Sequence, residues 1–314
     1  MSNLLFSLNI VLPIFFLIII GYLLKLKGLL TPEFRSKASN LVFYYCLPCS
    51  LFRSVAGSDI VSGFQLSFVL YAVLSTIAVF IIAWMLSAFI IKDRSQKSAV
   101  AHGSYRGNFA YVGLAILQNL LNTTSLTAAV LVITFVVPMY NILAILVLSH
   151  YDPSGKKPTV KSQLLAIIKN PLIIGILIGI PFSVFHITLP NMIDKTLSYM
   201  AQIATPVALL LIGANLAPET FIKKPKGILL GTFIKIVLAP GIFTVLGVLM
   251  GFRGEALATI FVMHGVPSAV NSYIMTEKMG GDAELGAGIV MATSLLCVIT
   301  MTIGIFLLKT YNLV

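Results

Sequence analysis

Four basic side chains interrupt the apolar stretches of this chain: His102, Arg106, Lys235 and His264. No aspartate or glutamate lies near the centre of any of these stretches. An ionisable group at the centre of a membrane helix costs about 2.5–3.5 kcal/mol on insertion scales, so each cation needs a partner or a function. Cations without carboxylates favour an anionic ligand and argue against a cation exchanger that is built on a membrane carboxylate.

Three of these cations have two interpretations each. Arg106 and Lys235 either bind an anionic substrate or donate hydrogen bonds to free backbone carbonyls. His264 has a side chain that titrates near physiological pH, so it either carries protons or is buried as a neutral group. We include all three in the predicted substrate site and leave both interpretations open.

Three neutral polar residues, Asn108, Ser268 and Asn271, complete the predicted substrate-binding set. They lie within a few positions of Arg106 or His264. An asparagine amide both donates and accepts hydrogen bonds, which suits a carboxylate as well as unpaired backbone groups.

The segment from Ala256 to Thr276 is uncharged except for His264 and long enough to cross a bilayer, but its centre is a poor helix. Gly265 loosens the backbone, and Pro267 removes one amide donor. Unpaired backbone groups cost several kcal/mol each in hydrocarbon, so such a break survives only inside protein or beside a cavity. Broken helices of this kind form binding sites in transporters.

The composition is that of a polytopic membrane protein. The chain has 314 residues, of which 58% are hydrophobic and 10% charged, and its mean hydropathy is +1.01. The net charge of +11 comes mostly from short loops, which argues against a nucleic-acid partner. No phosphate-binding loop, metal-ligand spacing or nucleophile–base pattern occurs, so we expect neither an enzyme, nor an ATP-driven pump, nor a bound metal.

Ten apolar segments predict an all-α protein with ten membrane spans. The loops after the first, third, fifth and seventh spans are basic and are predicted to be cytoplasmic, which places both termini outside. The connection after the ninth span is acidic and does not follow this pattern. The spans cover residues 4–24, 38–56, 65–91, 98–120, 125–149, 164–186, 196–216, 227–250, 256–276 and 285–308.

A shift of 158 residues superposes Pro13 on Pro171, Pro32 on Pro190 and Pro48 on Pro206. We therefore predict two five-helix repeats, residues 1–157 and 158–314, and an odd number of spans inverts the second repeat. The same shift places Arg106 on His264 and Gly107 on Gly265, so the fourth and ninth spans are predicted to be broken helices that cross. Gly107, Gly265 and Pro267 are the expected crossover backbone.

Four motifs carry a resemblance to the auxin efflux carrier (AEC) family, which includes plant auxin exporters and bacterial permeases. The motifs span nearly the whole chain and occupy residues 106–116, 169–175, 205–216 and 265–269. The resemblance implies a scaffold of spans 1, 2, 6 and 7 and a transport bundle of spans 3–5 and 8–10 that moves like an elevator. It also implies small organic anions such as malonate, malate or auxin-like acids, with Asn108 and Pro267 at the crossover. Plant members have proline where this chain has Arg106–Gly107, so neither the plant substrate nor the uncoupled mechanism is assumed for this chain.

We therefore expect a secondary carrier of mono- or dicarboxylates in a bacterial-type plasma membrane, surrounded by lipid. The alternatives are a sodium-coupled symporter of larger amphipathic anions, similar to bile-acid symporters, and, with less support, a channel or a polytopic enzyme. The coupling ion, H⁺ or Na⁺, and the existence of a homodimer stay open. No cofactor is expected.

Overall fold

The computed structural model describes residues 2–57, 65–123, 126–151, 169, 171–215 and 224–314. Regular structure in these residues is helical, and the only β contact among them is one isolated bridge. The α-helices are α1 (Ser2–Leu26), α2 (Pro32–Leu41), α3 (Leu47–Ala56), α5 (Leu66–Ile90), α6 (Arg94–Tyr105), α7 (Leu114–Leu121), α8 (Thr127–Tyr151), α10 (Pro171–Val184), α11 (Asn191–Ala214), α12 (Pro225–Phe233), α13 (Ala239–Leu249), α14 (Gly254–Gly265), α15 (Val270–Lys278) and α16 (Ala283–Thr310). Three π-helical segments join neighbouring helices: η1 (Val42–Cys46), η2 (Phe109–Gly113) and η4 (Ile234–Leu238).

Six helical stretches in the described part of the chain are long and apolar enough to cross a membrane, which makes this a multi-pass membrane protein. They are Leu4–Leu26, Leu66–Ile90, Thr127–Tyr151, Asn191–Ala214, Pro225–Leu249 and Ala283–Thr310. The other four predicted spans differ from a single long apolar helix. The span at 38–56 begins earlier, at Pro32, and passes through η1, whereas those at 98–120 and 256–276 are interrupted. Most of the first part of the span at 164–186 lies outside the described residues.

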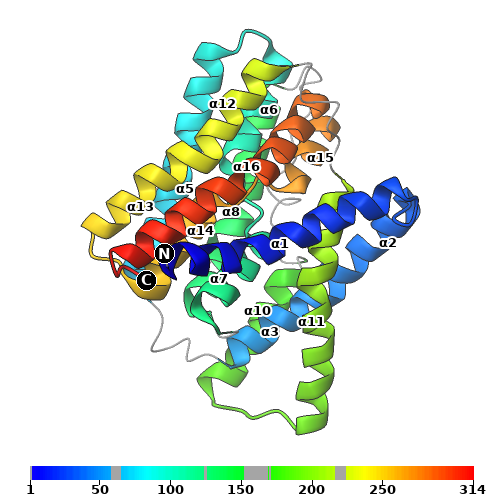
Figure 1. The fold of residues 1–314 in the computed structure, drawn as a ribbon, viewed down its shortest axis with the longest axis vertical. Coiled ribbons are helices and arrows are strands. Elements are labelled where there is room, and N and C mark those ends of the chain that lie inside the picture. Colours follow the sequence, from blue (N-terminus) through cyan, green and yellow to red (C-terminus); the bar gives the residue numbers. More distant parts are fainter. Residues whose placement is uncertain (1, 58–64, 124–125, 152–168, 170, 216–223) are drawn as a thin grey trace.

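The helices pack in two groups that each combine early and late parts of the chain (Figure 1). In the first group, α11 packs against α1 and α3, and α3 packs against α10. In the second group, α5, α6 and α8 pack together, and α16 packs against α6, α12 and α15. Helix α1 also contacts α16, so it lies between the two groups.

Glycines allow α1 and α11 to approach within backbone contact. A Cβ atom on Gly21 would overlap the Leu210 carbonyl, and one on Gly213 would overlap the Ile18 carbonyl. Small residues at helix interfaces increase van der Waals contact, which matters in membranes because lipid tails are as apolar as the side chains they replace. A larger side chain at either position would separate the two helices.

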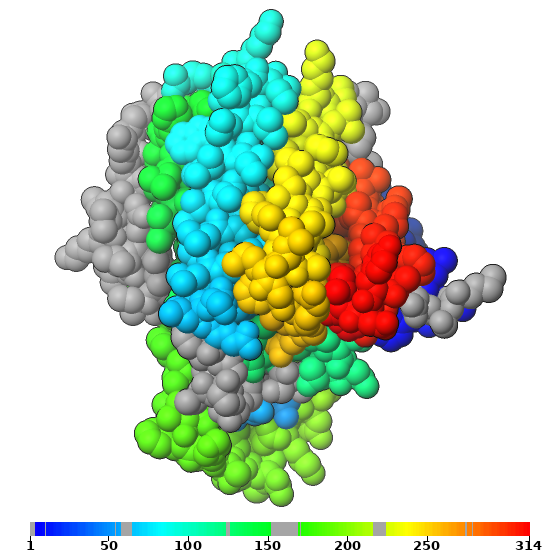
Figure 2. All heavy atoms as spheres, turned by 90° about the vertical axis from the view of Figure 1, so that its left-hand side faces the viewer, coloured from blue at the N-terminus to red at the C-terminus, as the bar shows by residue number. Residues whose placement is uncertain are grey.

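The outer face of the second group is apolar. Figure 2 shows α5 beside α12 and α13, and the Tyr71 hydroxyl donates to the Phe243 carbonyl across this contact. Large hydrophobic side chains on these helices are exposed, including Leu74, Phe89 and Leu249. An exposed apolar face of this kind is expected where a protein meets lipid rather than water.

Candidate functional site at the crossing of two broken helices

Both interruptions expected from the sequence are present. Helix α6 ends at Tyr105, and the backbone is extended at Arg106 before the chain becomes helical again at Phe109. Helix α14 ends at Gly265, and the backbone is extended at Val266 and Ala269 before α15 begins. Each break therefore leaves several backbone amides and carbonyls without partners inside their own helix.

The two extended segments satisfy part of this need by pairing with each other. Gly107 and Ser268 form an antiparallel bridge. The Asn108 amide donates to the Pro267 carbonyl at 2.7 Å, and the Ala269 amide donates to the Arg106 carbonyl at 3.0 Å. This short two-stranded contact, which we call the crossing, keeps backbone groups paired where neither segment is helical.

The contacts at the crossing are a separate relation from the residue correspondence that the sequence predicted between the two repeats, and that correspondence stays a prediction. A shift of 158 residues superposes Gly107 on Gly265, whereas the structure pairs Gly107 with Ser268. Arg106 likewise faces the Pro267–Ala269 strand rather than His264. The prolines that set the shift lie in other helices, while the pairing depends on where each broken helix becomes extended. Gly107 is needed for close approach, because a Cβ there would lie 2.9 Å from Val266 Cγ2.

Both donor groups of Ser268 form hydrogen bonds with neighbouring helices. Its hydroxyl donates to the Gly103 carbonyl near the end of α6, and its amide donates to Thr293 Oγ1 at 3.0 Å. The side chain is buried. Ser268 therefore closes the end of α6, and its predicted contact with the substrate stays a prediction.

Lys235 and His264 lie behind the crossing. Lys235 Nζ donates to the His264 carbonyl at 2.6 Å and lies 3.4 Å from the Met263 carbonyl. His264 Nε2 is 3.0 Å from Ser75 Oγ, and its ring packs against Phe243. Neither side chain belongs to the walls of the two cavities described next, so substrate contact by them also stays a prediction.

A cavity of 220 Å³, which we call the crossing cavity, lies against the other side of the crossing. A second cavity of 460 Å³ adjoins it between the crossing and helices α2 and α11, and we call this the α2–α11 cavity. The two share Asn108, Tyr111, Ala269 and Asn271 as wall residues, so they are neighbouring parts of one polar space. The polar wall of the crossing cavity consists of Arg106, Asn108, Tyr111, Tyr140, Asn141 and Asn271.

Arg106 is the cation on the wall of the crossing cavity. The residue is 7% exposed, and its Nη1 lies 3.0 Å from Met275 Sδ. A thioether is a weak acceptor, whereas a guanidinium has five N–H donors. The ion pairs found in the described part of the chain involve Lys37, Arg53 and Lys224, not Arg106. The geometry thus offers a buried, uncompensated guanidinium to a ligand in the crossing cavity.

Several wall residues were not predicted. Tyr111, Tyr140 and Asn141 line the crossing cavity, and Arg35 lines the α2–α11 cavity. Arg35 Nη1 also donates to the Ala214 carbonyl at 2.9 Å, near the end of α11. The sequence contains no signal that separates Asn141 from a packing residue, and Arg35 reads as one of several basic loop residues. Only their positions in space connect them to the site.

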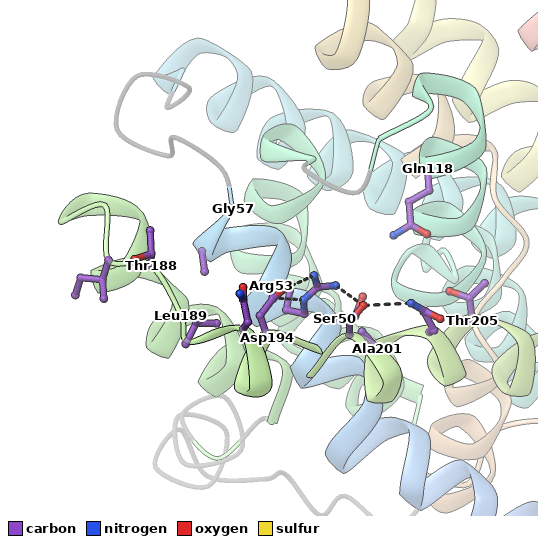
Figure 3. Close-up of a pocket in the computed structure, with 14 residues that line it drawn as sticks. Ser50, Arg53, Gly57, Gln118, Thr188, Leu189, Asp194, Ala201 and Thr205 are labelled. Carbon is purple, nitrogen blue, oxygen red and sulfur yellow. Dashed lines mark hydrogen bonds and ion pairs between the residues drawn. The ribbon is translucent and has the colours of Figure 1, made fainter. Parts of the chain in front are cut away.

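A third cavity, of 650 Å³, lies along the first part of α11 (Figure 3). Its wall carries a fork-shaped ion pair, in which Arg53 Nε and Nη2 lie 2.9 and 3.3 Å from the two Asp194 carboxylate oxygens. Arg53 Nη1 also donates to Ser198 Oγ at 3.1 Å, and Gln118 of α7 lies on a different helix across the cavity. This arginine differs from Arg106 because a carboxylate already neutralises it.

The structure also explains the acidic connection that departs from the basic-loop pattern. Lys224 Nζ, just before α12, lies 2.6 Å from Asp282 Oδ2 and 3.3 Å from Glu284 Oε2. Burial lowers the pKa of Lys224, but the hydrogen bonds to these two carboxylates outweigh burial and raise it above its ordinary value. The acidic loop therefore pairs with a basic loop on the same end of the molecule.

The sequence matches the family model described as "Membrane transport protein" over residues 6–305. A protein of Rhizobium meliloti (strain 1021) with the name "Putative malonate transporter" is 24% identical over 308 residues, with 96% of each chain covered. An uncharacterized transporter of Methanocaldococcus jannaschii is 23% identical over 297 residues, covering 91% of this chain and 94% of its own. An uncharacterized transporter of Escherichia coli (strain K12) is 22% identical over 310 residues, covering 96% of this chain and 97% of its own.

Proposed function

Because the chain belongs to the auxin efflux carrier family of membrane transport proteins, we propose that it is a secondary carrier of small organic anions. The observation that carries this proposal is the Arg106 guanidinium, which is buried beside the crossing cavity without a carboxylate partner among the described residues. A buried cation in this state favours a ligand that brings the missing negative charge.

A mono- or dicarboxylate fits the chemistry of the wall. The planar guanidinium of Arg106 matches a carboxylate with two parallel hydrogen bonds, and the amides of Asn108 and Asn271 can donate to the same ligand. The crossing cavity of 220 Å³ fits a small carboxylate beside Arg106, and the adjoining α2–α11 cavity leaves room for the rest of a larger ligand. The malonate named for the Rhizobium meliloti relative belongs to this class.

We further propose ten membrane spans in two inverted repeats, with α1, α3, α10 and α11 as a scaffold and the remaining spans as a moving bundle. Two of the three cavities support alternating access. The third cavity lies along the first part of α11, and the α2–α11 cavity lies along its last part. This helix has 24 residues, or about 36 Å, which is close to the thickness of a bilayer. In this scheme the bundle carries the crossing and its substrate past the scaffold in an elevator-like movement.

Membrane orientation is part of the same proposal. We place the protein in a bacterial-type plasma membrane with both termini outside, as the basic loops indicate. The N- and C-terminal helices lie close together, since Lys309 Nζ is 5.1 Å from the centre of the Phe6 ring (Figure 1). A reporter enzyme that is active only outside the cytoplasm checks this placement when it is fused to the C-terminus, and an inactive fusion would reverse it.

Uptake by purified protein in proteoliposomes tests the proposed substrate class. We expect uptake of at least one radiolabelled acid among acetate, malonate, malate and indole-3-acetate. Arg106→Gln should reduce that uptake about tenfold or more, because a charge-assisted double hydrogen bond is lost. Asn108→Ala should reduce it about three- to tenfold, since one hydrogen bond to the ligand disappears.

Arg94→Gln is the matched control, because it removes an arginine charge from an exposed residue whose Nη2 donates to the His150 carbonyl, far along α6 from the crossing. This variant should transport as the wild type does. Unchanged uptake of every tested acid by both Arg106→Gln and Asn108→Ala would show that the site is misplaced. Single-channel currents in planar bilayers would contradict a carrier of any kind.

A further inference from the structure

The end of α14 contains two carbonyls that the break deprives of their helical partners. In an unbroken helix the Met263 carbonyl would accept from residue 267, but Pro267 has no N–H group. The His264 carbonyl would accept from the Ser268 amide, which instead donates to Thr293 Oγ1 at 3.0 Å. Both carbonyls lie at the negative end of the α14 dipole, in the protein interior.

Lys235 is the partner of both carbonyls. Its Nζ lies 2.6 Å from the His264 carbonyl oxygen and 3.4 Å from the Met263 carbonyl oxygen. The residue is 1% exposed, and none of the ion pairs in the described part of the chain includes it. The positive charge is therefore compensated by backbone carbonyls and a helix end rather than by a carboxylate.

The space around the ammonium group is small and shaped by the crossing. A Cβ atom on Gly107 would lie 3.1 Å from Lys235 Nζ and 3.0 Å from the Met263 carbonyl oxygen. The ammonium thus sits between the end of α14 and the extended segment of the other broken helix. Its hydrogen bonds go to α14, and it packs against the Gly107 segment at the point where the two segments cross.

Free carbonyls at the end of a half-helix are the groups that coordinate Na⁺ in transporters with broken helices. We propose that the Lys235 ammonium is the resident cation of this crossing, occupying a monovalent-cation site that the chain fills for itself. Substrate binding then requires no Na⁺, because the charge that would hold the crossing together is covalently attached. Removal of the lysine side chain should leave a vacant site for Na⁺ or a small alkylammonium ion.

Thermal unfolding in detergent tests this proposal without any transport. The wild type and Lys235→Ala are compared in the chloride salts of sodium, potassium, methylammonium and choline at equal ionic strength, about 0.1 M, so that general screening is constant. The wild type should have the same Tm in all four salts. Lys235→Ala should be least stable in choline, and sodium or methylammonium should raise its Tm by about 2–8 °C, as expected for a ligand that binds only the folded protein.

Lys224→Ala is the control, since it removes a lysine that is paired with carboxylates outside the crossing. Its Tm should fall without being restored by any of the four cations more than by another. A sodium-specific rise in the wild-type Tm would overturn the proposal, and so would a folded Lys235→Ala protein that responds to the four salts equally.

A second measurement covers the case in which Lys235→Ala does not fold. Carboxylate binding to the wild type is titrated in sodium and in choline by the shift in Tm. Equal affinities support a resident cation, whereas at least tenfold tighter binding in sodium overturns it. The inference addresses the cation requirement of the proposed carrier, but cation rescue of Lys235→Ala would stand even if no carboxylate bound, so the two proposals fail separately.

Discussion

Two buried cations, Arg106 in the crossing and Lys235 on the neighbouring η4 segment, have different surroundings. Lys235 donates to two carbonyls at the end of α14, and its ammonium is enclosed by backbone. Arg106 follows the end of α6, and its guanidinium contacts a thioether while facing a cavity. Near the end of α6, the Gly103 carbonyl accepts a hydrogen bond from the Ser268 hydroxyl.

This difference shows why the position of a charge in an apolar stretch does not reveal its role. Both residues are cations whose burial costs free energy, and neither forms an ion pair with a carboxylate of the described chain. Lys235 donates its hydrogen bonds to backbone carbonyls and so stabilises the protein. Arg106 keeps free N–H donors and is therefore available to a ligand. Arg106 can stay free because a neutral group, the Ser268 hydroxyl, donates to the Gly103 carbonyl near the end of α6.

The largest effects are expected when Lys235 and Arg106 are each replaced by methionine, which removes the positive charge. Lys235→Met leaves two buried carbonyls unpaired and should lower the free energy of unfolding by about 2–5 kcal/mol, measured as a lower Tm in detergent. Arg106→Met removes no backbone partner, so its Tm should change little, while carboxylate binding weakens about tenfold or more. A Tm loss that is equal in the two variants would remove the distinction between them.

A smaller effect is expected at the hydroxyl that closes α6. Ser268→Ala leaves the Gly103 carbonyl without its donor in a buried site and should cost about 1–3 kcal/mol of stability, measured by the same unfolding assay. Ser272→Ala is the control, because the Ser272 hydroxyl donates to the Ala269 carbonyl one turn away in the same segment, and its loss should cost less. If the two variants were equally stable, Ser268 would not be needed to close the helix.

The smallest effect is expected at the ion pair in the third cavity, where Arg53 pairs with a carboxylate but is also exposed to water. The side chains of Arg53 and Asp194 are 30% and 44% exposed, so water screens their interaction and the coupling between them should be weak. A double-mutant cycle with Arg53→Gln and Asp194→Asn measures it, and about 0.5 M salt should weaken it. A strong coupling, or one that salt does not change, would show that the pair is effectively buried.

Much of the fold could be predicted from local sequence. The apolar segments predicted all six long apolar helices of the described chain to within a few residues, and Gly265 with Pro267 predicted the break between α14 and α15. The span at 38–56 was predicted too short at its start, because Lys37, which precedes the predicted span, lies inside α2 and pairs with Glu33 one turn earlier. The ten-span inverted topology stays a prediction.

The candidate site was predicted in part. Arg106, Asn108 and Asn271 were singled out as polar groups beside a break, and the structure brings all three to the wall of one cavity. Tyr140 and Arg35 were missed, because an aromatic residue in an apolar helix and an arginine in a basic loop carry no local signal. Ser268 was placed beside the break correctly, but its hydroxyl donates to α6 rather than facing the cavity.

The sequence by itself determined the class of protein, the presence of the breaks and the sign of the charge beside them. These properties follow from composition and from backbone chemistry, since the cost of burying a charge or an unpaired carbonyl does not depend on which neighbour relieves it. Only the tertiary structure decided that Gly107 meets Ser268, that Lys235 reaches the end of α14 and that Arg106 is left with a thioether. The physical reason is that the partners of these groups lie on other helices, 29 residues away for Lys235 and 169 residues away for Arg106, so their contacts are set by packing rather than by local sequence.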